Sequence, residues 1–346
     1  MANNSLTKYN NSILKRIRSY FKIRRFEKTI KSNKIKFEKI DNQNIDDVLN
    51  NPQKFDLPKS NYPNDFDPPI NKTDVINIIL NFYDDLDPEI GAKMRSLYKL
   101  HENEIFIYPY SKAEGGVSFP SAHKFEDGKE GICRINFKNN YLTLFNAAHE
   151  FNHLLLFSLG KENEQLSEVN PRFIELALAD YLVDNNIITE EQKNEHINAN
   201  TNIYENAKRL NDLREIYSIL EMNGRFNRNA INQLLAHCNG NFHKLENIMS
   251  YFERVFKGPE INRPKNNLRF INATVGSITL HELYKKDKIS FIKNYKDILF
   301  DRNELFHKYN YEAFFKDIEA KTEVPSIPSK DGIDIIEKNQ DIDRID

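Results

Sequence analysis

A helix with two histidines one turn apart is the feature that most constrains this chain. Residues 149–153 have the sequence HEFNH, the pattern H-E-x-x-H, and they lie in an apolar run that ends at Gly160. Residues four positions apart share one helix face, so both imidazoles can reach one metal ion. Glu150 lies beside them and can take a proton from a water molecule that zinc activates. The sequence therefore predicts a helix with a zinc site, in which His149 and His153 are ligands and Glu150 is the general base.

A zinc site of this kind needs a third protein ligand, and we predict that Glu175 provides it. Asn170 followed by Pro171 is typical of an N-cap and a first helical residue, which would open an apolar helix over residues 172–183. A carboxylate in such a helix is costly unless it is paired or bound to metal. Glu168 is the competing candidate, but the predicted cap places it before the helix, in the preceding loop.

The segments around this motif resemble the gluzincin peptidases of the oligoendopeptidase F and thimet oligopeptidase type. The motif followed by Pro171-Arg-Phe-Ile-Glu175 is similar to that family's pattern, in which the last residue is the third zinc ligand. The resemblance covers about two thirds of the chain, roughly 74–299. The family's substrate-binding sheet is matched by strand-like segments at 104–110, 115–118 and 131–137. Its late helices are matched by the segments 273–284 and 291–299.

The resemblance implies a mostly α fold with a small β-sheet (α+β), in which a zincin-like catalytic domain binds one Zn²⁺ per chain. It also implies an edge strand that runs beside a bound peptide, and hydrolysis of peptide bonds in oligopeptides. The residues that this places near the substrate are Gly115, Gly116 and Val117, where the glycines permit close approach of a peptide backbone.

This chain departs from the family at several positions. Asn152 replaces a glycine, and Leu156 stands where a third histidine is common. The family's late His and Tyr pair, which polarises the scissile carbonyl, has no counterpart, and an arginine could stabilise the oxyanion instead. The polar residues of this late segment are Arg263, Asn267, Arg269 and Asn272, and we take Arg263, Arg269 and His281 as candidate substrate-binding residues.

The charge distribution sets the N-terminal segment apart. Residues 1–40 carry twelve Lys or Arg and two Glu, a formal charge of +10, whereas the whole chain carries −2. We predict that residues 1–50 form a basic helical segment that caps the domain through a rough apolar stripe. Docking to an anionic membrane surface or to a partner through residues 1–40 is the alternative. Nucleic acid is disfavoured as a partner, because no nucleic-acid-binding signature accompanies the charge.

The remaining composition suggests how the chain is organised. Prolines in 51–72 predict a linker. We expect the zincin-like metallopeptidase domain at 73–320 and a disordered acidic tail at 321–346. The two cysteines, Cys133 and Cys238, provide no disulfide framework. No apolar run approaches the roughly 20 residues of a membrane span, and the N-terminus has no signal peptide pattern. We therefore expect a cytoplasmic protein, with export by a non-classical route left open.

Helix signals recur along the chain. Thr73 is the predicted cap of a helix over 74–83, Asp87-Pro88 opens another that reaches Leu100, and Thr189 to Gln192 form a capping box. Further helices are predicted near 201–221, 227–237, 241–256, 268–284, 288–299 and 303–318.

Three functions fit these observations. The first is a zinc metallopeptidase that cleaves oligopeptides. The second is a regulatory zinc protease that is specific for one protein, like the gluzincins that cleave phage repressors. Ala179-Asp180 resembles their motif, but the spacing from Glu175 is one residue too long. The third is a catalytically weak or inactive zincin that binds peptide or membrane through its basic N-terminus.

Overall fold

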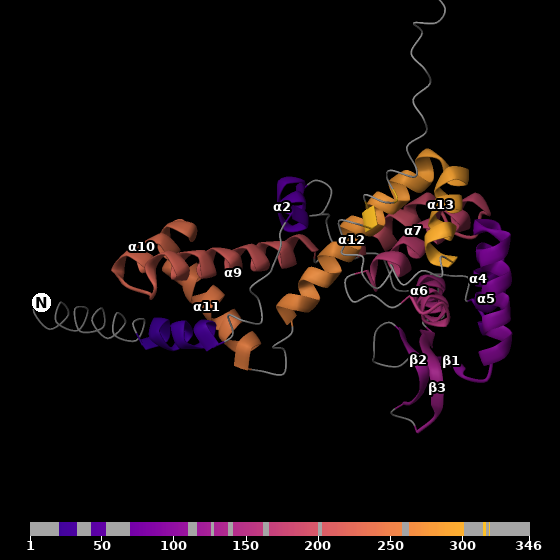
Figure 1. Ribbon diagram of the computed structural model, residues 1–346, viewed down its shortest axis with the longest axis horizontal. Coiled ribbons are helices and arrows are strands. Elements are labelled where there is room, and N and C mark those ends of the chain that lie inside the picture. Colours follow the sequence, from indigo (N-terminus) through magenta and orange to yellow (C-terminus); the bar gives the residue numbers. More distant parts are fainter. Residues whose placement is uncertain are drawn as a thin grey trace, which may run out of the picture.

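The computed structural model of this chain is predominantly helical and contains one small sheet, which confirms the predicted fold class. It describes residues 21–32, 43–52, 70–109, 116–125, 128–137, 141–161, 166–199, 203–257 and 263–300, together with 314, 315 and 318. The elements form two lobes (Figure 1). We call them the sheet lobe, which contains the three strands and the HExxH helix, and the helical lobe, built around α9, α10 and α11.

The sheet has three strands in the order β1-β3-β2, with β1 at Ile105–Pro109, β2 at Gly116–Lys124 and β3 at Glu130–Phe137. Strand β1 pairs with β3 in parallel, and β2 pairs with β3 in antiparallel register. The predicted strands are present, although β2 extends well beyond the predicted end at residue 118. Among the described strands β2 pairs only with β3 and forms one edge of the sheet.

The helices of the sheet lobe surround α6, the helix that carries the HExxH motif. The backbone amides of Glu89 and Ile90 donate to the carboxylate of Asp87, the predicted cap of α5. The first of these helices, α4, is instead capped by Asn71, whose side chain accepts from the amide of Asp74, so the predicted cap at Thr73 is wrong. The sheet-lobe helices are α4 Lys72–Leu86, α5 Pro88–His101, α6 Leu142–Ser158, α7 Val169–Asp184, α8 Glu190–Ala199, α12 Arg263–Lys286 and α13 Lys288–Phe300.

Helix α6 is apolar nearly all round, and its neighbours bury all of it but one stripe, on which His149 and His153 are partly exposed. It packs on β2 and β3, on α7, and on α4 and α5. Its side chains belong to the main hydrophobic core, which also takes in α13 and the end of α12. A helix that is hydrophobic around its whole circumference is buried. The histidines and the glutamate of α6 are therefore held in a rigid, close-packed environment.

The helical lobe explains the part of the basic N-terminal segment that the structure describes. Residues 21–32 form a helix whose apolar side chains Ile23, Phe26 and Ile30 are buried. They join the core formed by α9 Ile203–Asn223, α10 Arg228–His237 and α11 Phe242–Lys257. The basic side chains of Lys22 and Arg25 form ion pairs with glutamates of α11. This packing agrees with the interpretation of a capping helix for 21–32, and residues 1–20 lie outside the described residues.

Helix α12 runs from the helical lobe to the sheet lobe (Figure 1). Its first half packs with α2 (Gln43–Asn50) and α9, where Ile271 is fully buried. Its second half packs on α7. Most of the predicted linker 51–72, all of the tail 321–346 and most of the helix predicted at 303–318 lie outside the described residues. Within the described segments, no helix has the length and apolarity that crossing a membrane requires.

Candidate metal centre

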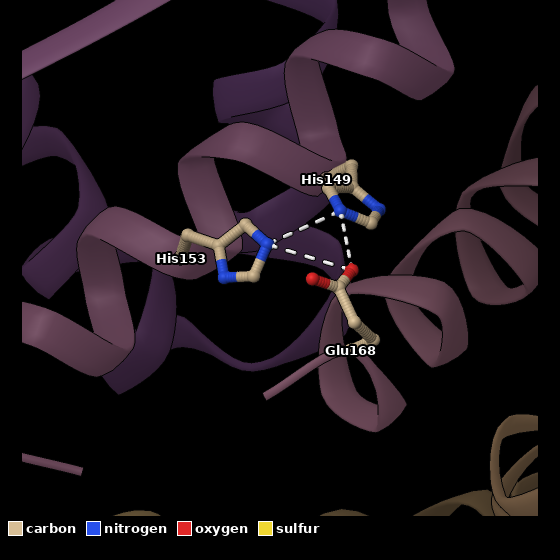
Figure 2. Close-up of side chains that lie close together, drawn as sticks. All are labelled: His149, His153 and Glu168. Atoms are coloured by element: carbon tan, nitrogen blue, oxygen red, sulfur yellow. Dashed lines mark hydrogen bonds and ion pairs between the residues drawn. The ribbon is translucent and has the colours of Figure 1, made fainter. Parts of the chain in front are cut away.

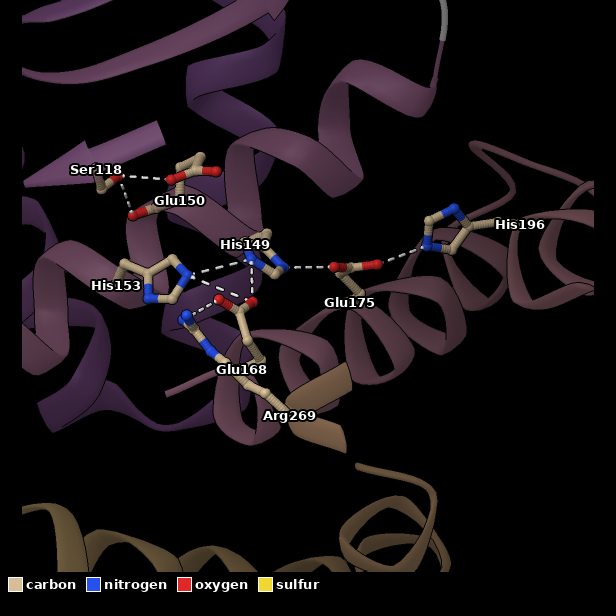
Figure 3. A network of polar contacts seen from close by, with 8 residues as sticks. All are labelled: Ser118, His149, Glu150, His153, Glu168, Glu175, His196 and Arg269. Carbon is tan, nitrogen blue, oxygen red and sulfur yellow. Dashed lines mark hydrogen bonds and ion pairs between the residues drawn. The ribbon is translucent and has the colours of Figure 1, made fainter. Parts of the chain in front are cut away.

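The HExxH motif lies in the middle of α6, and its residues point to two different neighbours. His149 and His153 face α7, whereas Glu150 faces the sheet (Figure 3). This division follows from helix geometry, because positions i and i+4 share a face and position i+1 is rotated away by about 100°. The imidazoles and the glutamate are thus presented by one rigid element.

Three side-chain atoms converge between α6 and the start of α7 (Figure 2). The Nε2 atoms of His149 and His153 lie 3.2 Å apart, and Glu168 Oε2 lies 3.2 Å from the first and 3.8 Å from the second. Metal–ligand bonds of 2.0–2.2 Å in a tetrahedron put neighbouring ligand atoms about 3.3–3.6 Å apart. Two nitrogens and one carboxylate oxygen at these distances therefore fit a single small divalent ion. Among the described residues, this is the group of His, Cys, Asp and Glu that could hold one.

Glu168, which the sequence led us to place in the loop, is the carboxylate that completes this group. Helix α7 begins at Val169, two residues before the predicted start at Pro171, and Glu168 occupies its N-cap position. The predicted cap, Asn170, is buried instead, and its side-chain oxygen accepts no hydrogen bond within the described residues. Pro171 is tolerated there because the amides of a helix's first turn have no intrahelical partner. The earlier start turns Glu168 toward the histidines.

Glu175, the expected third ligand, lies on the other side of the His149 ring. Its Oε1 is 2.5 Å from His149 Nδ1, whereas the group described above uses Nε2. Glu168 and Glu175 are seven residues apart, so they share a face of α7 but are separated by about 10 Å along the helix axis. In this geometry both cannot bind the same ion. The carboxylate grouped with the two Nε2 atoms in the structure is thus that of Glu168, whereas Glu175 contacts Nδ1 of His149.

Arg269 and Ser118 each hold one carboxylate near the histidines, Arg269 that of Glu168 and Ser118 that of Glu150. The guanidinium of Arg269, on α12, donates to Glu168 Oε1, the oxygen that does not face the histidines. The hydroxyl of Ser118, on β2, donates to Glu150 Oε2 at 2.8 Å. Sequence analysis did not identify Ser118, because its role depends on the register of β2 against α6. Arg269, predicted as a substrate-binding residue, contacts a member of the metal group instead.

Gly116 makes room for Glu150. A Cβ atom at Gly116 would lie 2.5 Å from Cγ and 2.8 Å from Oε1 of Glu150, far inside ordinary contact distance. The glycine therefore lets strand β2 approach Glu150, and its predicted role, close approach of a peptide backbone, stays a prediction. Val117 pairs with Arg134 in the sheet. Gly115 lies outside the described residues.

The burial of these groups strongly shifts their pKa values. Burial opposes the charged form of His149, but hydrogen bonds to Glu168 and Glu175 outweigh it and raise its pKa to about 10. Burial, reinforced by the neighbouring His149, lowers the pKa of His153 to about 4. Burial acts to raise the pKa of Glu168, yet its hydrogen bond to His149 lowers it to about 2. Without metal and at neutral pH, His149 is therefore protonated, His153 is neutral and Glu168 is ionised.

Glu150 differs from the other carboxylates. Burial raises its pKa to about 7, although His149 and the Ser118 hydroxyl oppose the rise. At neutral pH it is thus present in both protonation states, which is the condition for a group that accepts and returns a proton.

The other predicted site residues lie apart from this centre. His281, on α12, bonds through Nε2 to Asp180 Oδ2 at 2.7 Å. Asp180 is twelve residues beyond Glu168 on α7, about 18 Å along the helix, so His281 does not belong to the metal group. Arg263 is the first residue of α12, and its side chain lies outside the described part of the chain. Asn152, the substitute for the family's glycine, is fully buried beside the hydroxyls of Tyr83 and Tyr295.

Comparison with models of protein families, with curated proteins and with solved structures returned no match to this chain.

Proposed function

We propose that this chain is a zinc-dependent metallopeptidase that hydrolyses peptide bonds in oligopeptides. The observation that carries the proposal is the convergence of His149 Nε2, His153 Nε2 and Glu168 Oε2 at ligand spacing, with the buried Glu150 one residue along the helix. Three protein ligands leave one position of a tetrahedral ion open, which distinguishes a catalytic site from a structural one.

The donor set favours zinc over the other common divalent ions. Two imidazoles and one carboxylate are typical of catalytic zinc, whereas magnesium and calcium prefer oxygen ligands alone. When bound, the ion would act as a Lewis acid on the peptide carbonyl and lower the pKa of a nearby water. The identity of the metal is part of the proposal.

The chain's own residues supply the remaining chemistry. Glu150 would take a proton from the attacking water and deliver it to the departing nitrogen. The Ser118 hydroxyl restrains the Glu150 carboxylate by donating a hydrogen bond to Oε2, and Oε1 takes no part in that bond. Arg269 restrains Glu168 through Oε1 and leaves Oε2 facing the histidines.

The substrate in this proposal is an extended peptide. The free edge of β2 offers backbone donors and acceptors, and the same strand touches Glu150 through Ser118. A peptide added to this edge by β-augmentation would pass beside the proposed base. No feature of the described residues singles out one protein as the substrate, so we propose the oligopeptidase.

The test is the variant Glu150→Gln, assayed with a mixed peptide library and by elemental analysis. The amide keeps the shape of the side chain but cannot accept the proton. We expect about one zinc per chain in both proteins and a loss of cleavage of about 100-fold or more in the variant. The matched control is Glu205→Gln, an exposed glutamate on α9 that pairs only with Lys208 among the described residues. Near wild-type cleavage by Glu150→Gln would refute the assigned role.

A further inference from the structure

Glu175 connects His149 to a third histidine that belongs to a different helix (Figure 3). One carboxylate oxygen lies 2.5 Å from Nδ1 of His149, and the other lies 3.0 Å from Nε2 of His196. Both distances are those of hydrogen bonds, and a carboxylate between two imidazoles accepts one from the N–H of each ring.

This arrangement fixes the orientation of the His149 ring. With Nδ1 donating to Glu175, it is Nε2 that faces His153 and Glu168. Rotation of the ring would exchange a hydrogen bond to a buried carboxylate for none. Partners of this kind on metal-binding histidines select the tautomer and fix the ring plane.

His196 is itself held rigidly. Its ring stacks on Phe145 with centroids 3.6 Å apart and planes 6° from parallel, and the residue is 9% exposed. Phe145 lies on α6, four residues before His149 and on the same helix face. His196 therefore packs on α6 one turn before His149. The stacking places Nε2 of His196 on the carboxylate, which in turn determines where the carboxylate can lie.

We propose that His196, on α8, is a positioning residue of the metal centre, which acts through Glu175 to orient His149. This inference depends on the metal site of the proposed function. It assigns Glu175 as the bridge between the two histidines and makes α8 part of the centre.

A purely structural role predicts something different, and two substitutions separate the roles. His196→Phe keeps an aromatic ring on Phe145 but cannot donate to Glu175. His196→Gln loses the stacking but carries an amide N–H near the position of Nε2. If His196 only fills space, the Phe variant is the milder change. If it positions His149, the Gln variant is the milder one.

The experiment measures zinc affinity of the full-length wild type and of both variants by competition with a chromophoric chelator. We expect His196→Phe to weaken zinc binding by about 10- to 100-fold, the usual effect of losing an outer partner. His196→Gln should stay within about threefold of wild type. The unfolding temperature of each metal-free protein checks that the fold is intact. Equal affinities, or a weaker site in the Gln variant than in the Phe variant, would overturn the inference.

Cobalt substitution separates this inference from the proposed function. The visible absorption of bound Co²⁺ reports its direct ligands, so His196→Phe at saturating cobalt should show the wild-type spectrum. Glu168→Gln should change it. If Glu175→Gln changes the spectrum while Glu168→Gln does not, Glu175 is a ligand and the positioning role fails, although the metal site stands. If the wild type binds neither zinc nor cobalt, the proposed function fails as well.

Discussion

The contact between Gly116 and Glu150 leads to a prediction that requires neither metal nor substrate. In Gly116→Ala the new Cβ would lie 2.5 Å from Cγ, 2.8 Å from Oε1 and 2.9 Å from Cδ of Glu150, and these are its three nearest neighbours. Carbon atoms in proteins rarely approach closer than about 3.5 Å. Either β2 or the Glu150 side chain must therefore move by about 1 Å.

The expected loss of stability in Gly116→Ala follows from the kind of strain. Forcing an additional methyl group into a packed site costs about 1–3 kcal/mol of stability. If the Glu150 side chain is the part that moves, its carboxylate also loses the hydrogen bond that the Ser118 hydroxyl donates to it at 2.8 Å. In a Glu150→Ala background all three clashing atoms are gone. There the same Gly→Ala change should be neutral or stabilise by about 0.4–1 kcal/mol, because alanine restricts the unfolded chain.

The assay is chemical denaturation of wild type, both single variants and the double variant, with EDTA present throughout. We expect a coupling free energy of about 1–3 kcal/mol between the two positions. Val117→Ala is the control, since the next side chain along a strand points to the opposite face, and it should be additive with Glu150→Ala. If Gly116→Ala destabilises both backgrounds equally, the close approach of β2 to Glu150 is wrong. In the peptidase assay Gly116→Ala should lose about 100-fold while keeping one zinc per chain.

Two further predictions concern the cap of α8 and the charges around His149. The capping box is formed, with the Thr189 amide 2.7 Å from Gln192 Oε1 and the Gln192 amide 3.2 Å from Thr189 Oγ1, so Thr189→Ala should cost about 1 kcal/mol in denaturation with zinc stoichiometry unchanged. In metal-free protein, the contribution of ionised Glu168 to the free energy of unfolding should be present above about pH 4.5. It should be lost as pH falls through about 2, because the pKa of Glu168 is lowered from 4.5 to about 2. That of His149, whose pKa is raised from 6.5 to about 10, should be complete below about pH 6.5 and lost as pH rises through about 10. Thermal unfolding in EDTA should therefore show a steeper loss above pH 6.5 in wild type than in His149→Gln, and parallel curves would contradict it.

The sequence predicted the elements better than their relative rotation. The helix around the HExxH motif, the Asp87 cap and the Thr189 capping box all follow from local patterns, and all are present. The choice between Glu168 and Glu175 does not follow, because residues seven apart share one face of α7. Which of them meets Nε2 depends on where α7 begins and how far it slides along α6. The prolyl signal at residue 171 suggested a start two residues too late.

Contacts between segments far apart in the sequence were the second feature that could not be predicted from local patterns. His196 and Ser118 reach the centre from α8 and β2, 47 residues after His149 and 32 residues before Glu150. No local pattern marks either residue, and only the packing of α8 on α7 and of β2 on α6 brings them in. Arg269 was selected as a candidate from its segment, but its partner proved to be Glu168.

The packing of residues 21–32 in the helical lobe has a consequence for synthesis on the ribosome. This helix emerges early, yet Lys22 pairs with Glu246, which is translated 224 residues later. At about 5–20 residues per second, that interval is about 10–45 s. Throughout it, Ile23, Phe26 and Ile30 lack the core that buries them in the finished protein. During that interval the segment exposes apolar side chains whose partners are still to be synthesised, a condition under which nascent chains are prone to aggregate.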